Sequence, residues 1–244
     1  MKTIDKIIII FTNLFLLIVA VWAVTVPVTS SKAFYLYEFE KNNTVEASGY
    51  TQAELDNIAD VIIRFLMDKN DDMQVVINNI PVFSNQAIYH MQDVKDLYVA
   101  GKTIAIICLV FLILSIIYII FHYKRLKNIL FQYSVITITI ILFVCFTFAI
   151  YAFLDFDSAF TFFHRMIFPD EQKFNDAFFG YVSNYPELPG VSNLMLTTIL
   201  DERLFMDAGI IIGCVVVFVE VLWFTLLSIL KRKIPNLNDM ISVK

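Results

Sequence analysis

Two histidines, His90 and His164, are the side chains in this sequence best suited to moving protons. Imidazole both accepts and donates a proton near neutral pH, so it is the commonest general acid or base in enzymes. Each of the two histidines lies in a polar segment, near the end of a long apolar stretch. Their positions therefore indicate proton-transfer chemistry at a membrane surface, where a lipid headgroup can reach them.

A carboxylate accompanies the first histidine. Asp93 follows His90 by three residues, which places both side chains on one face if the segment is helical. Ser84 is suited to cap such a helix at its N-terminus. A carboxylate that accepts the imidazole N–H would fix the tautomer of His90 and raise its basicity. An ordinary surface helix is the alternative interpretation of this spacing.

A metal site is a second interpretation of the two histidines. His90, His164 and a carboxylate are common ligand types, but the sequence has no His-Glu-x-x-His helix. The third histidine, His122, flanks an apolar stretch and is expected to be an interfacial anchor. All three cysteines lie inside apolar stretches, so neither polar segment can hold a cysteine-ligated zinc or its own disulfide. We therefore expect no metal and no other cofactor.

The composition identifies an integral membrane protein, because 59% of the residues are apolar and only 17% are charged. A helix needs roughly 20 apolar residues to cross a hydrocarbon layer about 30 Å thick. The first qualifying stretch is too long for the core of a signal peptide, which has about 7–15 residues, so we expect it to be an uncleaved span. We predict a mainly α fold with four transmembrane helices, at Ile7–Val28, Thr103–Phe121, Ile129–Phe153 and Ala208–Leu230.

The basic residues predict an orientation in the membrane. The short segments 1–6, 122–128 and 231–244 are rich in lysine and arginine, and the positive-inside rule assigns them to the cytoplasm. The long segments Thr29–Lys102 and Leu154–Asp207 are then extracellular, and together they would form a small cap. Both are acidic, with eleven acids to six bases in the first and nine to three in the second. This charge argues against a nucleic-acid partner, which would require a basic patch.

Local patterns predict parts of the cap and one unusual residue in a span. Thr51 and Glu54 have the spacing of a capping box, which predicts the start of an amphipathic helix. The aromatic run Ala33–Phe39 is expected to be a short strand or a belt at headgroup level. Glu220 lies in the middle of the fourth span, where a charge costs at least about 2.5 kcal/mol. We expect it to be neutral and hydrogen-bonded, with a structural role.

Three motifs resemble those of the lipoprotein intramolecular transacylase (Lit) family of low-GC Gram-positive bacteria. They are His90–Lys95 before the second span, Asp155–Phe168 after the third, and Leu200–Asp207 before the fourth. The resemblance implies an enzyme that moves the sn-2 acyl chain of an S-diacylglyceryl cysteine onto the α-amino group of that cysteine. It implies catalysis by His90 and His164 on the extracellular side of the plasma membrane. The implied partners are membrane lipids and diacylglyceryl-modified lipoproteins with a free N-terminal cysteine.

A non-enzymatic protein is the competing interpretation of the same sequence. A membrane sensor or assembly protein would use the cap to bind a partner, and its histidines would be dispensable. A transporter is a weaker interpretation, because internal repeats and paired helices broken by glycine or proline are absent from the sequence.

Overall fold

The computed structural model describes residues 3–168, 190–192 and 194–233. The chain forms two compact units. We call the first the bundle unit, made of residues 1–24, 103–150 and 212–244. We call the second the head unit, made of residues 25–102 and 151–211.

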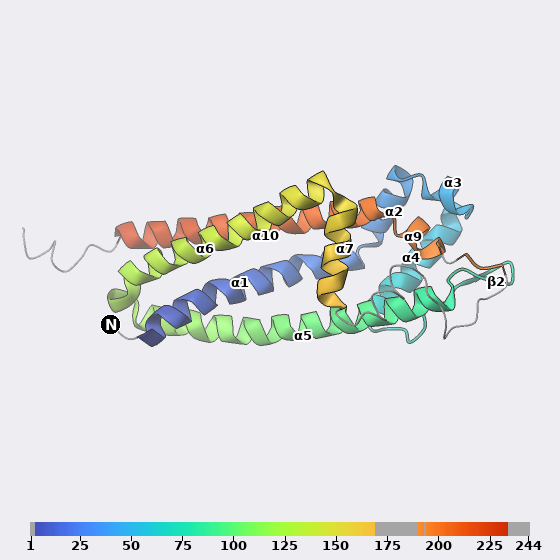
Figure 1. Ribbon diagram of the computed structural model, residues 1–244. Coiled ribbons are helices and arrows are strands. Elements are labelled where there is room, and N and C mark those ends of the chain that lie inside the picture. Colours follow the sequence, from blue (N-terminus) through green and yellow to red (C-terminus); the bar gives the residue numbers. More distant parts are fainter. Residues whose placement is uncertain (1–2, 169–189, 193, 234–244) are drawn as a thin grey trace, which may run out of the picture. The chain divides into compact units, whose positions relative to one another are not determined.

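Four long helices confirm the predicted fold class (Figure 1). They are α1 (Thr3–Ser30), α5 (Asn85–Phe121), α6 (Tyr123–Leu154) and α10 (Glu202–Lys233). All four are apolar enough to cross a membrane, and the chain is a multi-pass membrane protein. The helices extend beyond their apolar stretches. The connection expected at 122–128 is helical from Tyr123 onward.

Polar groups join three helices inside the bundle unit. The Asn13 side chain of α1 donates to the Ser134 hydroxyl of α6 at 3.2 Å and accepts from the Trp223 indole N–H of α10 at 3.0 Å. Asn13 and Ser134 are fully buried, so these bonds form where water is excluded. One cluster of buried apolar residues in this unit consists of Ile9, Ile119, Leu126, Ile129, Leu130 and Leu227.

Glu220 differs from the expectation in one respect. Its side chain is fully buried in the bundle unit, as a structural carboxyl would be. However, neither carboxyl oxygen has a hydrogen-bond partner among the residues that the structure describes. The expected hydrogen bond is therefore not found. Sequence alone cannot reveal this, because burial of a helix face does not determine which polar groups meet it.

The head unit is built from short helices and one hairpin. The helices are α2 (Lys32–Lys41), α3 (Thr44–Ser48), α4 (Gln52–Leu66), α7 (Phe156–Ile167) and α9 (Met195–Ile199). Strands β1 (Val76–Ile77) and β2 (Ile80–Pro81) pair antiparallel. The ends of α1, α5 and α10 complete this unit.

The expected strand at Ala33–Phe39 is wrong, because this segment lies in helix α2. The Ser31 side chain caps the helix by accepting a hydrogen bond from the Phe34 backbone N–H at 3.3 Å. Tyr35 and Phe39, one turn apart, are both buried, and their rings meet edge-on at 6.3 Å. Packing of this helical face therefore outweighs the strand propensity of the aromatic residues.

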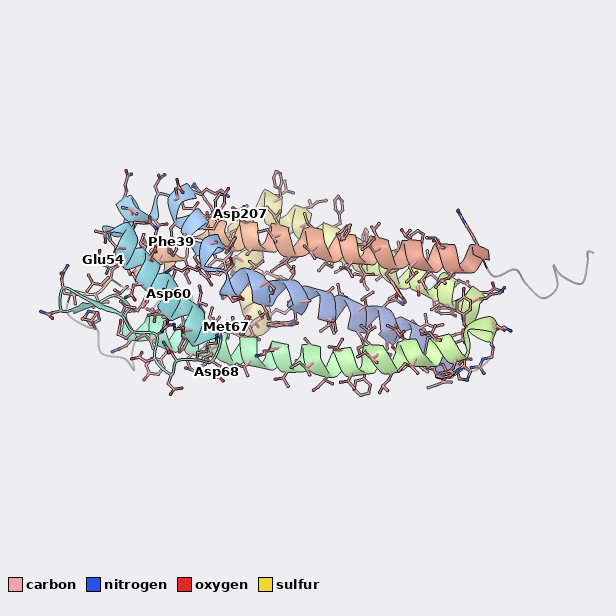
Figure 2. The ribbon with its side chains drawn as sticks, turned by 180° about the vertical axis from the view of Figure 1, so that it is seen from behind. Phe39, Glu54, Asp60, Met67, Asp68 and Asp207 are labelled. Atoms are coloured by element: carbon pink, nitrogen blue, oxygen red, sulfur yellow. The ribbon has the colours of Figure 1, made fainter. Side chains whose placement is uncertain are left out.

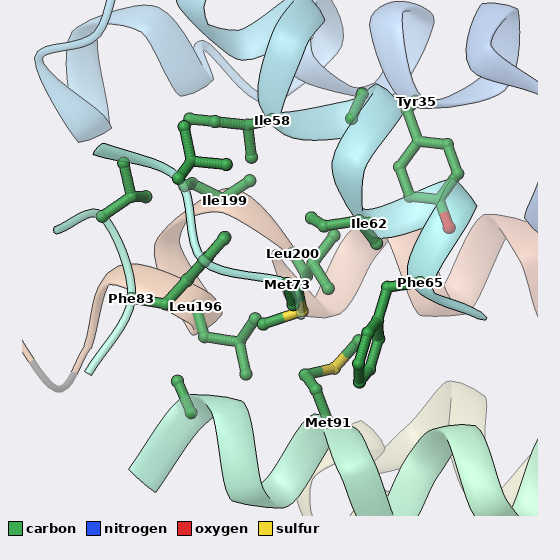
Figure 3. Close-up of a cluster of buried hydrophobic side chains, with 14 of the residues drawn as sticks. Tyr35, Ile58, Ile62, Phe65, Met73, Phe83, Met91, Leu196, Ile199 and Leu200 are labelled. Atoms are coloured by element: carbon green, nitrogen blue, oxygen red, sulfur yellow. The ribbon is translucent and has the colours of Figure 1, made fainter. Parts of the chain in front are cut away.

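Helix α4 begins as predicted. The Thr51 hydroxyl accepts from the Glu54 backbone N–H, while the Glu54 carboxylate accepts from the Thr51 backbone N–H at 2.8 Å. Its apolar face is buried in the core of the head unit. Figure 3 shows this core, in which side chains of α4, α9 and α5 meet, including Ile62, Ile199 and Met91.

A buried lysine ties α5 to the loop after α4. Lys95 is only 6% exposed. Its ammonium contacts the Asp68 carboxylate at 2.9 Å, donates to the Asn70 carbonyl at 3.0 Å and lies 4.8 Å from the centroid of the Phe65 ring. Asp68 is labelled in Figure 2. His90 and Asp93 lie on the same stretch of α5. The contacts of Lys95 therefore fix the position of the helical turns that carry these two residues.

A second polar cluster joins α2 to the first turns of α10. Glu38 is 1% exposed and accepts a hydrogen bond from the Asn42 side chain at 3.3 Å. Asp207, labelled in Figure 2, binds the Lys41 ammonium. Burial, and then the neighbouring Asp207 carboxylate, raise the pKa of Glu38. Glu38 therefore keeps its proton to a higher pH than an ordinary carboxyl does.

This proton makes the stability of the head unit depend on pH. The pKa of Glu38 is higher in the folded chain than in the unfolded chain, so the neutral form favours folding. That contribution is complete below the ordinary carboxyl pKa and is lost as pH rises through the raised pKa. We expect the thermal midpoint of the detergent-solubilised protein to fall as pH rises through the raised pKa of Glu38. Glu38→Gln should reduce this fall, whereas the exposed Glu40→Gln on the same helix should not. Equal pH profiles in the two variants would refute this role of Glu38.

Candidate active site

His164 lies on α7, which follows the span α6 after the single residue Asp155. The Asp155 carboxylate caps α7 by accepting a hydrogen bond from the Ser158 backbone N–H at 3.0 Å. Phe162, Phe163 and Met166 are exposed apolar residues on this helix. The short connection therefore starts α7 at the end of a membrane span, with apolar side chains on its surface.

The tautomer of His164 follows from a hydrogen bond within α7. Its Nδ1 lies 2.9 Å from the backbone carbonyl oxygen of Phe160, one turn earlier. A carbonyl oxygen can only accept, so Nδ1 carries the proton and Nε2 is the nitrogen of the neutral ring that has the lone pair. The backbone thus fixes the tautomer in which Nε2 is the basic nitrogen of His164.

His90 lies in the second turn of α5. The Ser84 hydroxyl caps this helix as predicted, accepting a hydrogen bond from the Ala87 backbone N–H at 3.2 Å. Met91 is buried in the core of the head unit, which fixes the rotation of the helix around His90. His90 lies more than three turns before Thr103, where the long apolar stretch of α5 begins.

The structure brings His90 and His164 together. Their ring centroids are 6.1 Å apart, and the ring planes differ by 27°. Two imidazoles this close can border the same substrate group. The Nδ1 atom of His122 is likewise hydrogen-bonded to the backbone carbonyl four residues earlier, that of Tyr118. A bond of this kind alone therefore does not identify an active site. The facing second imidazole distinguishes His164.

Aromatic rings surround the histidine pair. The Phe160 ring lies 4.1 Å from the His164 ring, and Phe168 lies 5.9 Å from His90 and 6.0 Å from His164. Phe205 of α10 contacts Phe160 at 5.7 Å. Both histidines are half-buried. The imidazoles thus face an apolar surrounding that suits a substrate with fatty acyl chains.

This surrounding keeps both imidazoles neutral. Burial lowers the pKa of His90, the positive charge of a protonated His164 lowers it further, and the Asp93 carboxylate partly opposes both effects. Burial also lowers the pKa of His164, opposed by the Phe160 carbonyl. The two rings are therefore unprotonated near neutral pH, which is the form required of a general base.

Asp93 and His122 are the other residues that the sequence singled out, and only Asp93 interacts with the histidine pair. Asp93 acts on His90 through its charge, consistent with their three-residue spacing on α5. His122 stacks on Tyr118 at 4.4 Å within the bundle unit. Among the described residues, no three His, Cys, Asp or Glu side chains gather as a metal site would require.

Sequence reasoning did not assign a role to Phe160. Its carbonyl fixes the His164 tautomer, and its ring covers the imidazole. The four-residue spacing between Phe160 and His164 was the available signal, because residues at that spacing are neighbours on a helix. After α7 the sequence contains Pro169, Pro186 and Pro189, which predict a loop or a re-entrant hairpin, and these residues lie outside the described part of the chain.

Comparisons with known proteins agree with this architecture. The chain resembles the structure of the membrane integral lipoprotein intramolecular transacylase Lit from Bacillus cereus, with a TM-score of 0.70 and 20% identity, over 96% of this chain and 98% of that one. Two structures of the same protein with a histidine replaced, by arginine or by alanine, give TM-scores of 0.67 and 0.62 at 19% identity, over 94% of this chain and 93% of theirs. At this identity the likeness establishes the fold.

The curated protein sequences give no significant match. The family model for lipoprotein intramolecular transacylase Lit, however, matches residues 7–175, which include both histidines and three of the four long helices. The match covers more than half of the chain. The chain therefore belongs to the lipoprotein intramolecular transacylase Lit family.

Proposed function

We propose that this protein moves the sn-2 acyl chain of an S-diacylglyceryl cysteine onto the α-amino group of the same cysteine, at the N-terminus of a lipoprotein. The observation that carries this proposal is the pair of neutral imidazoles, His90 and His164, with ring centroids 6.1 Å apart. The product is a lyso-form lipoprotein with an amide-linked acyl chain.

The reaction needs two proton movements, which two imidazoles can supply. The α-amino group has a reference pKa of roughly 7.7–8, so it has to lose a proton to attack the ester carbonyl and form a C–N bond. The C–O bond to glycerol then breaks, and the glyceryl oxygen gains a proton. One histidine acts as the base toward the amine, and the other donates a hydrogen bond to the developing oxyanion. The proton taken from the amine is then given to the glyceryl oxygen as the C–O bond breaks.

No nucleophilic side chain is required for this transfer, because the amine and the ester belong to one molecule. Holding the two groups in contact can supply up to roughly 7–11 kcal/mol of the barrier reduction. The apolar rings of Phe160 and Phe168 beside the histidines provide a surface on which an acyl chain can be held.

We further propose that the protein lies in the plasma membrane with the head unit outside. A cysteine introduced at Asn43, in the head unit, should then react in intact cells with a thiol reagent that cannot cross the membrane. A cysteine at Asn128, in the basic segment, should react only after the cells are broken. Asn184, in the second segment expected outside, and Asn236, in the tail expected inside, could be tested in the same way, and both lie outside the described residues. Labelling of Asn128 alone in intact cells would invert the topology.

Mass spectrometry of a lipoprotein tests the proposed activity. The gene would be expressed in a bacterium that lacks it, and the N-terminal peptide of an abundant lipoprotein would be analysed. We expect a peptide with one ester-linked and one amide-linked acyl chain. A diacylglyceryl peptide with a free amine, at normal enzyme level, would contradict the transacylase and favour a non-enzymatic membrane protein.

A further inference from the structure

A groove of about 490 Å³ opens on the bundle unit. It is lined by five residues of α6 and by Lys231 near the end of α10. The α6 residues are Asn128, Phe131, Gln132, Val135 and Ile136. Neither histidine of the candidate active site contributes to this groove, and the residues that line it have no role in the proposed reaction.

The lining changes from polar to apolar along α6. Asn128 and Gln132 are four residues apart and share one face of the helix, while Val135 and Ile136 occupy the next turn of that face. Asn128 lies near the basic start of α6, and Ile136 lies deeper in the apolar stretch that begins at Ile129. A phospholipid has the same order, with a polar headgroup followed by acyl chains.

Lys231 gives the polar end of the groove a positive charge. Its ammonium lies 4.0 Å from the centroid of the Phe131 ring, which also lines the groove. This cation–π contact holds the lysine against the groove wall. None of the lining residues is acidic. The groove thus contains one cation and two side-chain amides. Its lining has no carboxylate that could pair with the cationic part of a zwitterionic headgroup.

We propose that this groove binds one phospholipid with an anionic headgroup. The Lys231 ammonium pairs with the phosphate, and the amides of Asn128 and Gln132 hydrogen-bond to the headgroup. An acyl chain lies against Val135 and Ile136. Charge complementarity favours an anionic lipid over a zwitterionic one, and the exposed Lys124 at the same end of α6 adds to the attraction.

Native mass spectrometry of the full-length protein in detergent tests the proposal. The protein would be titrated with phosphatidylglycerol and with phosphatidylcholine of identical acyl chains. We expect one phosphatidylglycerol to bind with at least a roughly fivefold preference, and Lys231→Gln to weaken it by a similar factor. Arg232→Gln removes an equal charge from the same turn but does not line the groove. This control should change binding less than twofold.

Two further variants separate the groove from general surface charge. Ile136→Trp fills the groove without changing the charge, and should weaken phosphatidylglycerol binding as much as Lys231→Gln. Lys231→Arg keeps the cation and should preserve binding. Equal losses in Lys231→Gln and Arg232→Gln would show diffuse attraction only and overturn the proposal. Unchanged binding in Ile136→Trp, or equal binding of both lipids by the unmodified protein, would also overturn it.

Discussion

Replacing either His90 or His164 with alanine is expected to remove nearly all transacylase activity. Each imidazole moves or stabilises a proton in the same reaction, and general acid–base catalysis contributes roughly 10²–10⁴-fold. Since the two rings face each other at 6.1 Å, neither can replace the other after a substitution. The measurement is the ratio of lyso-form to diacylglyceryl lipoprotein at matched enzyme level.

The double variant should be scarcely less active than the weaker single variant, because groups that act in one step are strongly non-additive. His122→Ala is the matched control. This histidine makes the same bond to the carbonyl four residues earlier, but its ring stacks on Tyr118 and not on another histidine. Two small losses that simply add, or full activity in either His90→Ala or His164→Ala, would contradict the proposed site.

Asp93→Asn is expected to lower turnover by roughly 10–100-fold, the range seen when supporting partners of metal-bound histidines are removed. The Asp93 carboxylate favours the protonated form of His90, against the effect of burial. Without this charge, the pKa of His90 falls further and the imidazole becomes a weaker base. The acidic limb of the pH–rate profile should therefore move to lower pH while the maximal rate decreases.

Asp96→Asn is the control for this prediction. Asp96 lies on the same helix, is exposed, and accepts a hydrogen bond from the exposed Gln92 side chain at 3.0 Å. Its pH–rate profile should match that of the unmodified enzyme. A purely structural role for Asp93 would lower protein yield and leave the pH profile in place, and that result would remove Asp93 from the proton-transfer machinery.

Local sequence signals predicted the features that depend on neighbouring residues. The four apolar stretches, the Thr51–Glu54 capping box and the Ser84 cap all involve residues within a few turns of each other, and the structure contains all of them. Helix α2 was mispredicted because its conformation depends on a core to which distant residues contribute. Tyr35 and Phe39 pack there with Leu196 and Ile199, more than 150 positions later in the chain.

The same limit applies to the candidate site. Asp93 was predictable as a neighbour of His90, because three-residue spacing has a fixed meaning on a helix. No periodicity joins His90 to His164, since they lie on separate helices of the head unit. Only the resemblance to a family linked the two histidines before the structure. The contact between the Phe205 and Phe160 rings could likewise not be predicted from the sequence, because it depends on how α10 packs against α7.

The hydrogen bond between Asn13 and Trp223 has a consequence for biogenesis. The donor follows its acceptor by 210 residues, so α1 is synthesised long before α10. During that interval the Asn13 amide oxygen lies in the bilayer without the indole N–H that later donates to it. The early insertion intermediate is therefore less stable than the finished bundle. Insertion of α10 is therefore the step that satisfies Asn13 and stabilises the bundle.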